Sequence, residues 1–450
     1  MRKYTWKKRL LATMLATGIV VTGMPDTGID LSKVIAATVS KQSDIITEDG
    51  FRYNSDGYLY EYTGTATDIV IPEGVTEISP SAFDKVDITS VVIPGTIKKI
   101  NRYCFNKCSN LKKVVMKEGV EIIGWDSFAK CTSLTEVTIP DSVTTIEMEA
   151  FGGTTSVTEI SLPKSLKILG ARAFAESGIT SITIPGSVEN VGFGAFCNCA
   201  SLKKVAIEEG VKSMEFSVFQ GDKALTEVSL PKTLTKIGSR AFAGSGIIEV
   251  TVPGSVENIE SETFANCTSL QSVALEDGVK SVGGRAFSGD TALKSITFPS
   301  TGLEEIKSFA FSKCQNIEEL DIQSCEVIED YAFSNPKSLK KLHIGSGVKR
   351  IGEYAFSSCY ELEELTIDPG LEMIGDKAFC GAEKLTSLEF PNTLTYIGYE
   401  AFSSAKQLSD VLLPTGLKYM GKGAFHNSIW LNNLYDKART EGKFYDLSES

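Results

Sequence analysis

The amino-acid sequence predicts a mainly β solenoid, in which parallel strands joined by short turns or 3₁₀ segments stack one per repeat. First, a phenylalanine recurs sixteen times at intervals of 22 to 24 residues. Second, apolar and polar residues alternate before most prolines of the repeat, as in a half-exposed strand. Third, glycine, proline and β-branched residues punctuate every unit, which excludes a helical repeat. The repeat phenylalanines are Phe83, Phe105, Phe128, Phe151, Phe174, Phe196, Phe219, Phe242, Phe264, Phe287, Phe311, Phe333, Phe356, Phe379, Phe402 and Phe425.

The stretch SLTEVTIPDSVTTI, which starts at Ser133, shows the order of elements within one unit. Val137 and Ile139 alternate with polar residues and predict a strand. Proline ends this strand because it has no N–H to donate to a ladder, and ten of the fourteen prolines hold this place. A second inward-facing segment follows, and Phe151 then fills the interior. One turn cannot bury its own apolar face, so about 16 such units are expected to stack into a continuous core.

Residues 1–37 have the pattern of a secretory signal peptide. The basic segment MRKYTWKKR precedes the apolar segment LLATMLATGIVV, which is too short for an ordinary membrane span. Small residues at VIAAT predict cleavage after Ala36 or Ala37, and an uncleaved anchor helix is the alternative. No later segment is apolar enough to span a bilayer, so an exported protein without a membrane span after cleavage is expected.

The flanks of the array read as caps, which stacked repeats require. Residues 38–67 are expected to form a linker and a hairpin, because aromatic and polar residues alternate around the turn sequence from Asn54 to Gly57. The array itself spans 68–428. Residues 429–450 are expected to form a capping helix and tail, with Ser428 as the N-cap of a segment whose apolar residues have helical spacing.

The chain is acidic, with a formal charge of −12. Residues 1–36 carry six basic and two acidic side chains, so the remaining chain carries about −16 by the same count. An acidic surface of this kind argues against nucleic acid or anionic lipid as the main partner. A monomer is expected.

Six of the ten cysteines share one position, three residues after the repeat phenylalanine, which we name the +3 slot. Other repeats place serine, threonine or alanine there, which indicates a small, buried position in which a thiol acts as a small hydrophobe. Disulfides are the alternative for an exported chain. The candidate pairs on neighbouring repeats are Cys108 with Cys131 and Cys359 with Cys380, whereas slots two or more repeats apart are too distant to bridge. No C-x-x-C pair suggests zinc, and no metal or cofactor is expected.

His343 is the first candidate for a catalytic residue, because it is one of only two histidines in the chain. It holds the middle outward position of its strand, where adjacent repeats place Asp321, Thr366 and Glu389. An acid, an imidazole and a hydroxyl in a row resemble a triad superficially. A flat, open sheet provides no oxyanion hole and does not exclude water, so solvated strand side chains are the better interpretation and no enzyme is expected.

The extended strand face is the surface through which solenoids usually bind partners. Its middle outward position starts apolar, continues with small hydroxyl residues and ends charged. No aromatic residue stands in this row, which argues against a lectin, and small side chains suit a broad protein contact. The alternative is that Thr and Ser are present only for their strand propensity. The candidate binding residues are Val70, Val92, Val115, Thr138, Ser161, Thr183, Ser229, Thr251, Thr297, Asp321, His343, Thr366 and Glu389.

The consensus L-x-x-V-x-I-P-x-x-V-x-x-I-G-x-x-A-F-x-x-C resembles the BspA-type (Treponema pallidum-type) leucine-rich repeat over about residues 68–428. The resemblance implies a secreted or cell-surface protein that binds or adheres rather than catalyses. No LPxTG-like sorting motif or lipobox is present. We therefore expect an exported, non-enzymatic protein that binds a host or neighbouring-cell surface protein through its strand face. A passive structural or surface-layer component without a specific ligand is the alternative.

Overall fold

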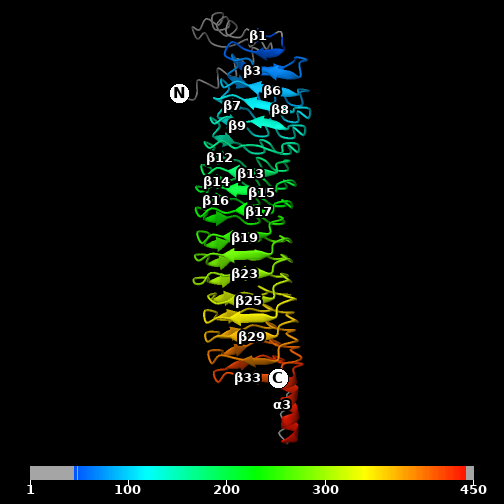
Figure 1. Cartoon of the computed structure of the whole chain (residues 1–450), viewed down its shortest axis with the longest axis vertical. Helices are drawn as coiled ribbons and strands as arrows, with labels where there is room; N and C mark the ends of the chain where they lie inside the picture. The colour runs from blue at the N-terminus through cyan, green and yellow to red at the C-terminus, as the bar shows by residue number, and fades with distance from the viewer. Residues whose placement is uncertain (1–44, 48, 442–450) are drawn as a thin grey trace, which may run out of the picture. The chain divides into compact units, whose positions relative to one another are not determined.

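The computed structural model of the chain describes residues 45–47 and 49–441. The array is a β-solenoid of sixteen rungs, which we number by the repeat phenylalanine, from rung 1 with Phe83 to rung 16 with Phe425 (Figure 1). The predicted solenoid fold is thus confirmed. The predicted signal peptide, residues 1–37, and the end of the predicted tail, residues 442–450, lie outside the described residues.

The rungs contribute strands to two parallel ladders, and every rung except rung 5 contributes a strand to each. The strand face contains β4 (Asp68–Val70), β6 (Ser90–Ile93), β8 (Lys113–Met116), β10 (Glu136–Thr138), β13 (Ser181–Ile184), β15 (Lys204–Ile207), β17 (Glu227–Ser229), β19 (Glu249–Val252), β21 (Ser272–Leu275), β23 (Ser295–Thr297), β25 (Glu319–Ile322), β27 (Lys341–Ile344), β29 (Glu364–Ile367), β31 (Ser387–Glu389) and β33 (Asp410–Leu412). The second ladder contains β5 (Glu77–Ile78), β7 (Lys99–Ile100), β9 (Ile122–Ile123), β11 (Thr145–Ile146), β12 (Ile168–Leu169), β14 (Asn190–Val191), β16 (Ser213–Met214), β18 (Lys236–Ile237), β20 (Asn258–Ile259), β22 (Ser281–Val282), β24 (Glu305–Ile306), β26 (Val327–Ile328), β28 (Arg350–Ile351), β30 (Met373–Ile374), β32 (Tyr396–Ile397) and β34 (Tyr419–Met420).

The strand face is not the flat, continuous sheet expected from the sequence. It is divided into sheets of four, three, three, three and two strands, and within 49–441 rung 5 contributes no strand to it. The second ladder is more continuous, with one sheet of seven strands from β7 to β18 and one of eight from β20 to β34. The expectation was wrong because the consensus repeat hides small differences between units, and these decide which neighbouring strands pair.

The repeat phenylalanines form one stacked column through the core. Neighbouring rings lie 4.7 to 5.5 Å apart between centroids, with planes within 18° of parallel. Each ring is at most 2% exposed. The residues two positions before and two positions after each phenylalanine have positive φ, and these positions account for all non-glycine residues with positive φ in the described chain. The resulting turns replace the 3₁₀ alternative, since no 3₁₀ helix occurs in 49–441.

The N-terminal hairpin is present as predicted. β2 (Phe51–Tyr53) pairs antiparallel with β3 (Tyr58–Tyr62), and β3 pairs parallel with β5 of rung 1. β1 (Ile45–Ile46) extends this sheet. The Tyr62 ring stacks on Phe83 at 5.8 Å, so the hairpin continues the aromatic column.

The C-terminal helix α3 (Ile429–Thr440) also forms where predicted, and the Ser428 side chain accepts the N–H of Leu431 as its N-cap. Trp430 packs edge-on against Phe425 at 4.9 Å. None of the helical residues is buried, and Met420 of the last rung remains 48% exposed. The helix therefore covers the end of the core with its first turn alone.

We predict that the substitution Phe356→Ala lowers the free energy of unfolding by about 3–5 kcal/mol, because it removes a fully buried ring and leaves a cavity between two others. Urea denaturation followed by circular dichroism measures the loss. Phe193→Ala, which truncates a ring that is 43% exposed, is the control and should cost about 1 kcal/mol or less. Equal losses in the two variants would contradict a column that stabilises the array.

Candidate functional site

The structure places most of the predicted binding residues on the strand face as expected. The ladders align them in four separate rows: Val70, Val92, Val115 and Thr138; Thr183 and Ser229; Thr251 and Thr297; Asp321, His343 and Thr366. Ser161 lies on rung 5, outside any strand, and Glu389 lies on the separate pair β31 and β33. The candidate surface is therefore a series of short sheets rather than one strip.

The apolar start of the strand face is smaller than predicted. Val70 is 62% exposed because no strand of the face precedes β4. Val92 and Val115 are half-buried, because the side chains of the adjacent rungs cover each of them on both sides. The exposed apolar surface in this row is thus essentially that of Val70.

His343 is held by two carboxylates, which removes the triad hypothesis. Its Nδ1 lies 2.9 Å from Oδ1 of Asp321, and its Nε2 lies 3.2 Å from Oδ2 of Asp368. A triad would need one of these nitrogens free to accept the proton of Thr366, which is its ladder neighbour but not its hydrogen-bond partner. The sequence missed Asp368 because it lies beyond the end of β29, where strand periodicity no longer places side chains.

Charged residues at the start of the strands form ion pairs from rung to rung. Lys113 lies 2.7 Å from Glu136, and Lys204 lies 2.9 Å from Glu227. These pairs are exposed, so each contributes at most about 1 kcal/mol. Glu249 holds the same position on β19 without an ion-pair partner among the described residues.

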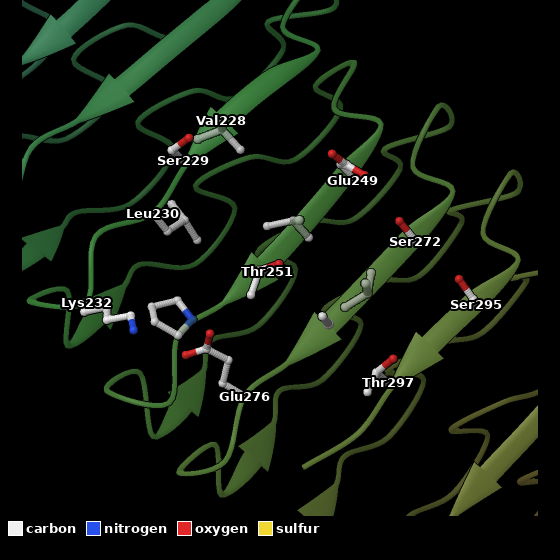
Figure 2. A pocket seen from close by; sticks show the side chains of 14 residues that line it. Val228, Ser229, Leu230, Lys232, Glu249, Thr251, Ser272, Glu276, Ser295 and Thr297 are labelled. Atoms are coloured by element: carbon white, nitrogen blue, oxygen red, sulfur yellow. The ribbon is translucent and has the colours of Figure 1, made fainter.

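Shallow grooves interrupt the strand face at several sheet breaks, and two of them, groove A and groove B, repeat each other. Groove A is lined by Ile160, Leu162, Lys164 and residues of rungs 6 and 7, and encloses about 490 Å³. Groove B, lined by Val228, Leu230, Lys232 and residues of rungs 9 to 11, encloses about 430 Å³ (Figure 2). Corresponding residues lie 68 positions apart, as Lys164 and Lys232 do, so the grooves are repeats of each other. Their apolar floors are half-buried, whereas equivalent residues on most rungs are fully buried.

Glycine contacts explain which strands stay together. The turn after β13 approaches the next rung so closely that a Cβ on Gly186 would lie 1.8 Å from the carbonyl oxygen of Glu209. The same holds for Gly254 and Asp277 after β19. On the preceding rungs, 5 and 8, the corresponding position holds Lys164 or Lys232. Groove A lies between rung 5, which carries Lys164, and the closely packed rungs 6 to 8. Groove B lies between rung 8, which carries Lys232, and the closely packed rungs 9 to 11.

Half-buried aromatic residues form a column elsewhere on the array, which the search along the strand face did not include. Phe309, Tyr331 and Tyr354 stack at 4.8 Å on successive rungs. Arg285 covers the outer face of this stack at Phe309, and Lys377 covers the opposite end at Tyr354. Because neighbouring rings and cations occupy the ring faces, the column does not offer sugars the open faces on which they stack.

All ten cysteines are free, so the disulfide alternatives Cys108–Cys131 and Cys359–Cys380 are not present. The six thiols of the +3 slot are buried, and five of them donate instead to the carbonyl oxygen of the phenylalanine one rung earlier. Cys108 donates to Phe83 at 3.0 Å, and Cys131 donates to Phe105 at 3.1 Å. The small-residue interpretation of this slot is confirmed, with a hydrogen-bonding role added to it.

Two rungs carry an aspartate in the +3 slot, which the sequence analysis missed. Asp222 and Asp290 are fully buried, and each accepts the backbone N–H of a cysteine on the preceding rung, at 2.7 and 2.8 Å. The second oxygen of each carboxyl group has no hydrogen-bond partner among the described residues. Desolvation raises the pKa of both groups well above the usual value, against the effect of the cysteine N–H. The signal was the Gly-Asp pair that follows Phe219 and Phe287 at the same distance.

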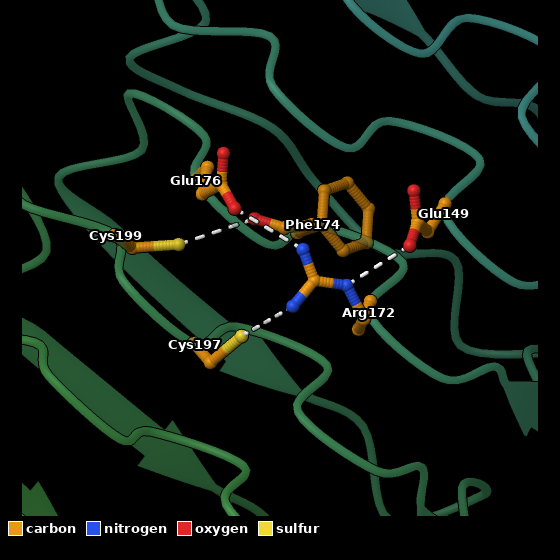
Figure 3. A network of polar contacts seen from close by, with 6 residues as sticks. All are labelled: Glu149, Arg172, Phe174, Glu176, Cys197 and Cys199. Atoms are coloured by element: carbon orange, nitrogen blue, oxygen red, sulfur yellow. Dashed lines mark hydrogen bonds and ion pairs between the residues drawn. The ribbon is translucent and has the colours of Figure 1, made fainter.

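Cys197 is the thiol that most resembles a reactive nucleophile, because its Sγ lies 3.4 Å from the Arg172 guanidinium (Figure 3). Arg172 is already engaged by Glu149 at 2.9 Å and by Glu176 at 3.1 Å. Burial raises the pKa of the Cys197 thiol despite the nearby cation. The thiolate, which is the nucleophilic form, is therefore disfavoured.

The described residues contain no cluster of three or more histidine, cysteine or acidic side chains that could hold a metal ion. In the same part of the chain, no helix has the length and apolarity needed to cross a membrane. What the strand face offers is an extended surface with hydroxyl groups, exposed backbone at the sheet breaks and two repeated grooves. Such a surface can bind, and it carries no arrangement of acid, base and nucleophile.

Comparisons with known proteins agree with the fold. A family model described as BspA type leucine rich repeat region (six copies) matches residues 56–155, 144–271, 257–367 and 326–441. A leucine-rich repeat protein from Bacteroides ovatus is 23% identical, with a TM-score of 0.63 over 80% of this chain and 98% of that one. A leucine rich cell surface protein from Faecalibacterium prausnitzii is 27% identical, with a TM-score of 0.40 over 73% and 93% of the chains. Of these two, the first superposes well enough to support the fold, and at this identity it supports the fold alone. No curated protein matches the chain.

We predict that Asp222→Asn changes how stability depends on pH. In the wild type, the unfolded state releases the Asp222 proton above about pH 4 while the native state retains it, so stability falls as pH rises towards the raised native pKa. The advantage of the variant should therefore grow as the pH rises from about 4 towards the raised native pKa, by up to about 1.4 kcal/mol per pH unit. Urea unfolding at several pH values measures this difference, and a constant offset would refute it. The exposed Asp56→Asn is the control.

We predict that the native protein reacts slowly with a thiol reagent such as 5,5′-dithiobis(2-nitrobenzoate). At pH 8, only Cys380, which is half-buried whereas the other nine are buried, should react within minutes. In denaturant all ten thiols should react. A smaller number in denaturant without reductant would show that disulfides form, and rapid labelling of Cys197 in the native state would contradict the raised pKa.

Proposed function

The chain belongs to the BspA-type leucine-rich repeat family, and from this premise we propose that it is an exported, non-enzymatic protein that binds a partner protein through its strand face. Proteins of this repeat family are generally binding scaffolds. The observation that supports the proposal most is the strand face itself, which exposes small hydroxyl side chains and unpaired backbone where its sheets break. A protein partner can satisfy both kinds of polar group.

Export is proposed from the pattern of residues 1–37, and a surface protein of a host or neighbouring cell is the proposed partner. The candidate residues of the middle rungs are small and exposed, so a broad contact with many weak anchors suits them better than a deep pocket. The open grooves, rather than the valine row, are the proposed anchoring points, because half-buried apolar side chains lie beside free polar groups there. Neither groove holds a cofactor in this proposal.

A structural role by self-association is the second candidate, and the open end of the core favours it. Met420 takes the place that Ile397 holds one rung earlier, yet Met420 is 48% exposed and Ile397 is fully buried. Leu412 is 59% exposed on the same rung. A repeat array usually requires a polar cap at such an end, and a second molecule would supply the missing cover.

We predict that residues 38–450 bind extracellular-matrix proteins, mucins or whole cells saturably, and that Thr183→Lys, Ser229→Lys and Thr251→Lys together weaken binding at least tenfold. Three lysines would insert bulk and charge into a surface of small side chains. Surface plasmon resonance measures the affinity.

The matched control carries Thr132→Lys, Ser201→Lys and Ser269→Lys, which alter exposed hydroxyl residues that precede the strands. Equal binding by the two triple variants would place the site away from the strand face. If no partner binds and sedimentation shows self-association that Met420→Lys abolishes, the structural role is correct instead.

A further inference from the structure

The junction between rungs 8 and 9 differs from every other junction of the array. On the strand face, β17 pairs with β15 and β19 pairs with β21, but β17 and β19 do not pair with each other. In the second ladder, β18 ends one sheet and β20 begins the next. At each of the other junctions between the sixteen rungs, all within 49–441, at least one ladder continues. Rungs 1–8 and 9–16 are therefore two stacks with a double break between them.

The two stacks remain joined mainly along the phenylalanine column. Phe242 stacks on Phe264 at 5.3 Å with planes 2° apart. On the same side, the N–H groups of Arg240, Phe242 and Gly244 donate to Ser261, Thr263 and Ala265 at 3.2, 2.8 and 2.8 Å. Arg240 also binds Glu262 through two nitrogens, at 2.8 and 3.1 Å. On the opposite side, the bond from Ser255 Oγ to the Leu234 carbonyl, 2.6 Å long, crosses the junction. Strong contacts on one flank and few on the other are the geometry of a hinge.

Groove B lies over the open side of this junction (Figure 2). Its floor is formed by Val228 and Leu230, which are half-buried. The Leu230 N–H has no hydrogen-bond partner in the described chain, whereas the corresponding N–H of Phe390 donates to the next rung. The facing edges of β17 and β19 thus present main-chain donors and acceptors to the groove without pairing.

The two ends of groove B differ in charge, because one end holds an acidic side chain alone and the other holds a basic and an acidic side chain. Glu249 stands at the start of β19, and Lys232 follows the end of β17 at the other end of the groove (Figure 2). Neither has an ion-pair partner among the described residues. Glu276, which follows β21, lies at the Lys232 end of the groove, and its carboxylate accepts the N–H of Gly254 at 3.4 Å (Figure 2). The length of strand between the two charged ends corresponds to about five extended residues.

We propose that the junction between rungs 8 and 9 is a hinge, and that groove B binds an extended polypeptide segment of the partner when the hinge opens. The main chain of this segment pairs with the open edges of β17 and β19, as an added strand does in β-augmentation. A basic residue of the segment meets Glu249, and an acidic residue about five positions away meets Lys232. The assignment of a polypeptide segment to groove B rests on the proposed function, whereas the hinge does not depend on it.

A polypeptide fits groove B better than a glycan for two reasons. Strand edges match the spacing of peptide N–H and C=O groups, and both edges of the groove are strands. Sugars usually stack on open aromatic faces, and no aromatic residue lines the groove. Opening the junction on the strand-face side leaves the phenylalanine column in contact, so binding does not require the core to separate.

Distances between spin labels test the hinge independently of any partner. Labels at Thr183→Cys and Thr297→Cys span the junction, and labels at Thr251→Cys and Thr366→Cys span the same number of rungs within the second stack. Cys380 is the one native thiol that is not buried, so it can also take up the label. The protein without introduced cysteines, labelled at Cys380 alone, is therefore a further control. We expect electron–electron double resonance to give a distance distribution at least twice as broad for the first pair. Equal widths would overturn the hinge.

A disulfide across the junction tests whether a polypeptide binds in groove B when the junction opens. Ser229→Cys with Thr251→Cys closes the break, and Thr183→Cys with Ala206→Cys is the matched control at a junction that is already paired. Phage-displayed random dodecapeptides selected on the wild type should carry basic and acidic residues about five positions apart. They should bind the oxidised Ser229→Cys, Thr251→Cys protein at least tenfold more weakly, recover on reduction, and bind the control as they bind the wild type.

The other outcomes separate the two proposals. Peptides that bind the oxidised protein unchanged, or a selection that enriches none, would overturn groove B as a peptide site. The proposed function would still stand if the strand-face triple lysine variant loses its protein partner. It would fail if that variant keeps full binding. If a polysaccharide binds and the disulfide weakens its binding, the hinge proposal stands, and the proposal that groove B binds a polypeptide is wrong.

Discussion

The column of stacked phenylalanines is the constraint on which the rest of the array depends. Each ring is positioned by a turn whose residues two before and two after it adopt left-handed backbone conformations, and most of these are not glycine. An L-residue in that region costs about 1–2 kcal/mol, so every rung carries a local penalty. Burial of the ring and hydrogen bonds from the turn to the next rung offset it. The turn therefore forms only in a stack, which makes each rung dependent on its neighbours.

Around this column, one-residue differences between units decide where the strand ladders continue. Gly186 and Gly254 permit backbone contacts that no side chain would allow, and they draw rungs 6 and 7, and rungs 9 and 10, together. The rungs before them carry Lys164 and Lys232 instead, and the strands beside these lysines do not pair across the junction. The grooves thus arise from the same periodicity that builds the solenoid, as places where a set of three rungs ends.

The groups of the array that most resemble catalytic residues are either engaged by neighbouring side chains or buried. His343 is held between two carboxylates, and Cys197 is desolvated beside an arginine that is already paired. Asp222 and Asp290 are buried with raised pKa values, and neither residue lines groove A or groove B. Groups that remain free to interact, such as Lys232, Glu249 and the backbone of Leu230, gather on the strand face.

The sequence by itself determined the solenoid, the number of rungs, the hairpin, the helix after Ser428 and the buried character of the +3 slot. These follow from periodicity, because a side chain repeated at one position in every rung must meet its own copies in the stack. It also placed the row from Val70 to Glu389 on one face. Only the tertiary structure decided which strands pair, that Asp368 rather than Thr366 meets His343, and that Asp222 is buried. These depend on backbone distances of a few ångströms between rungs, which the pattern of residue types within a rung does not contain.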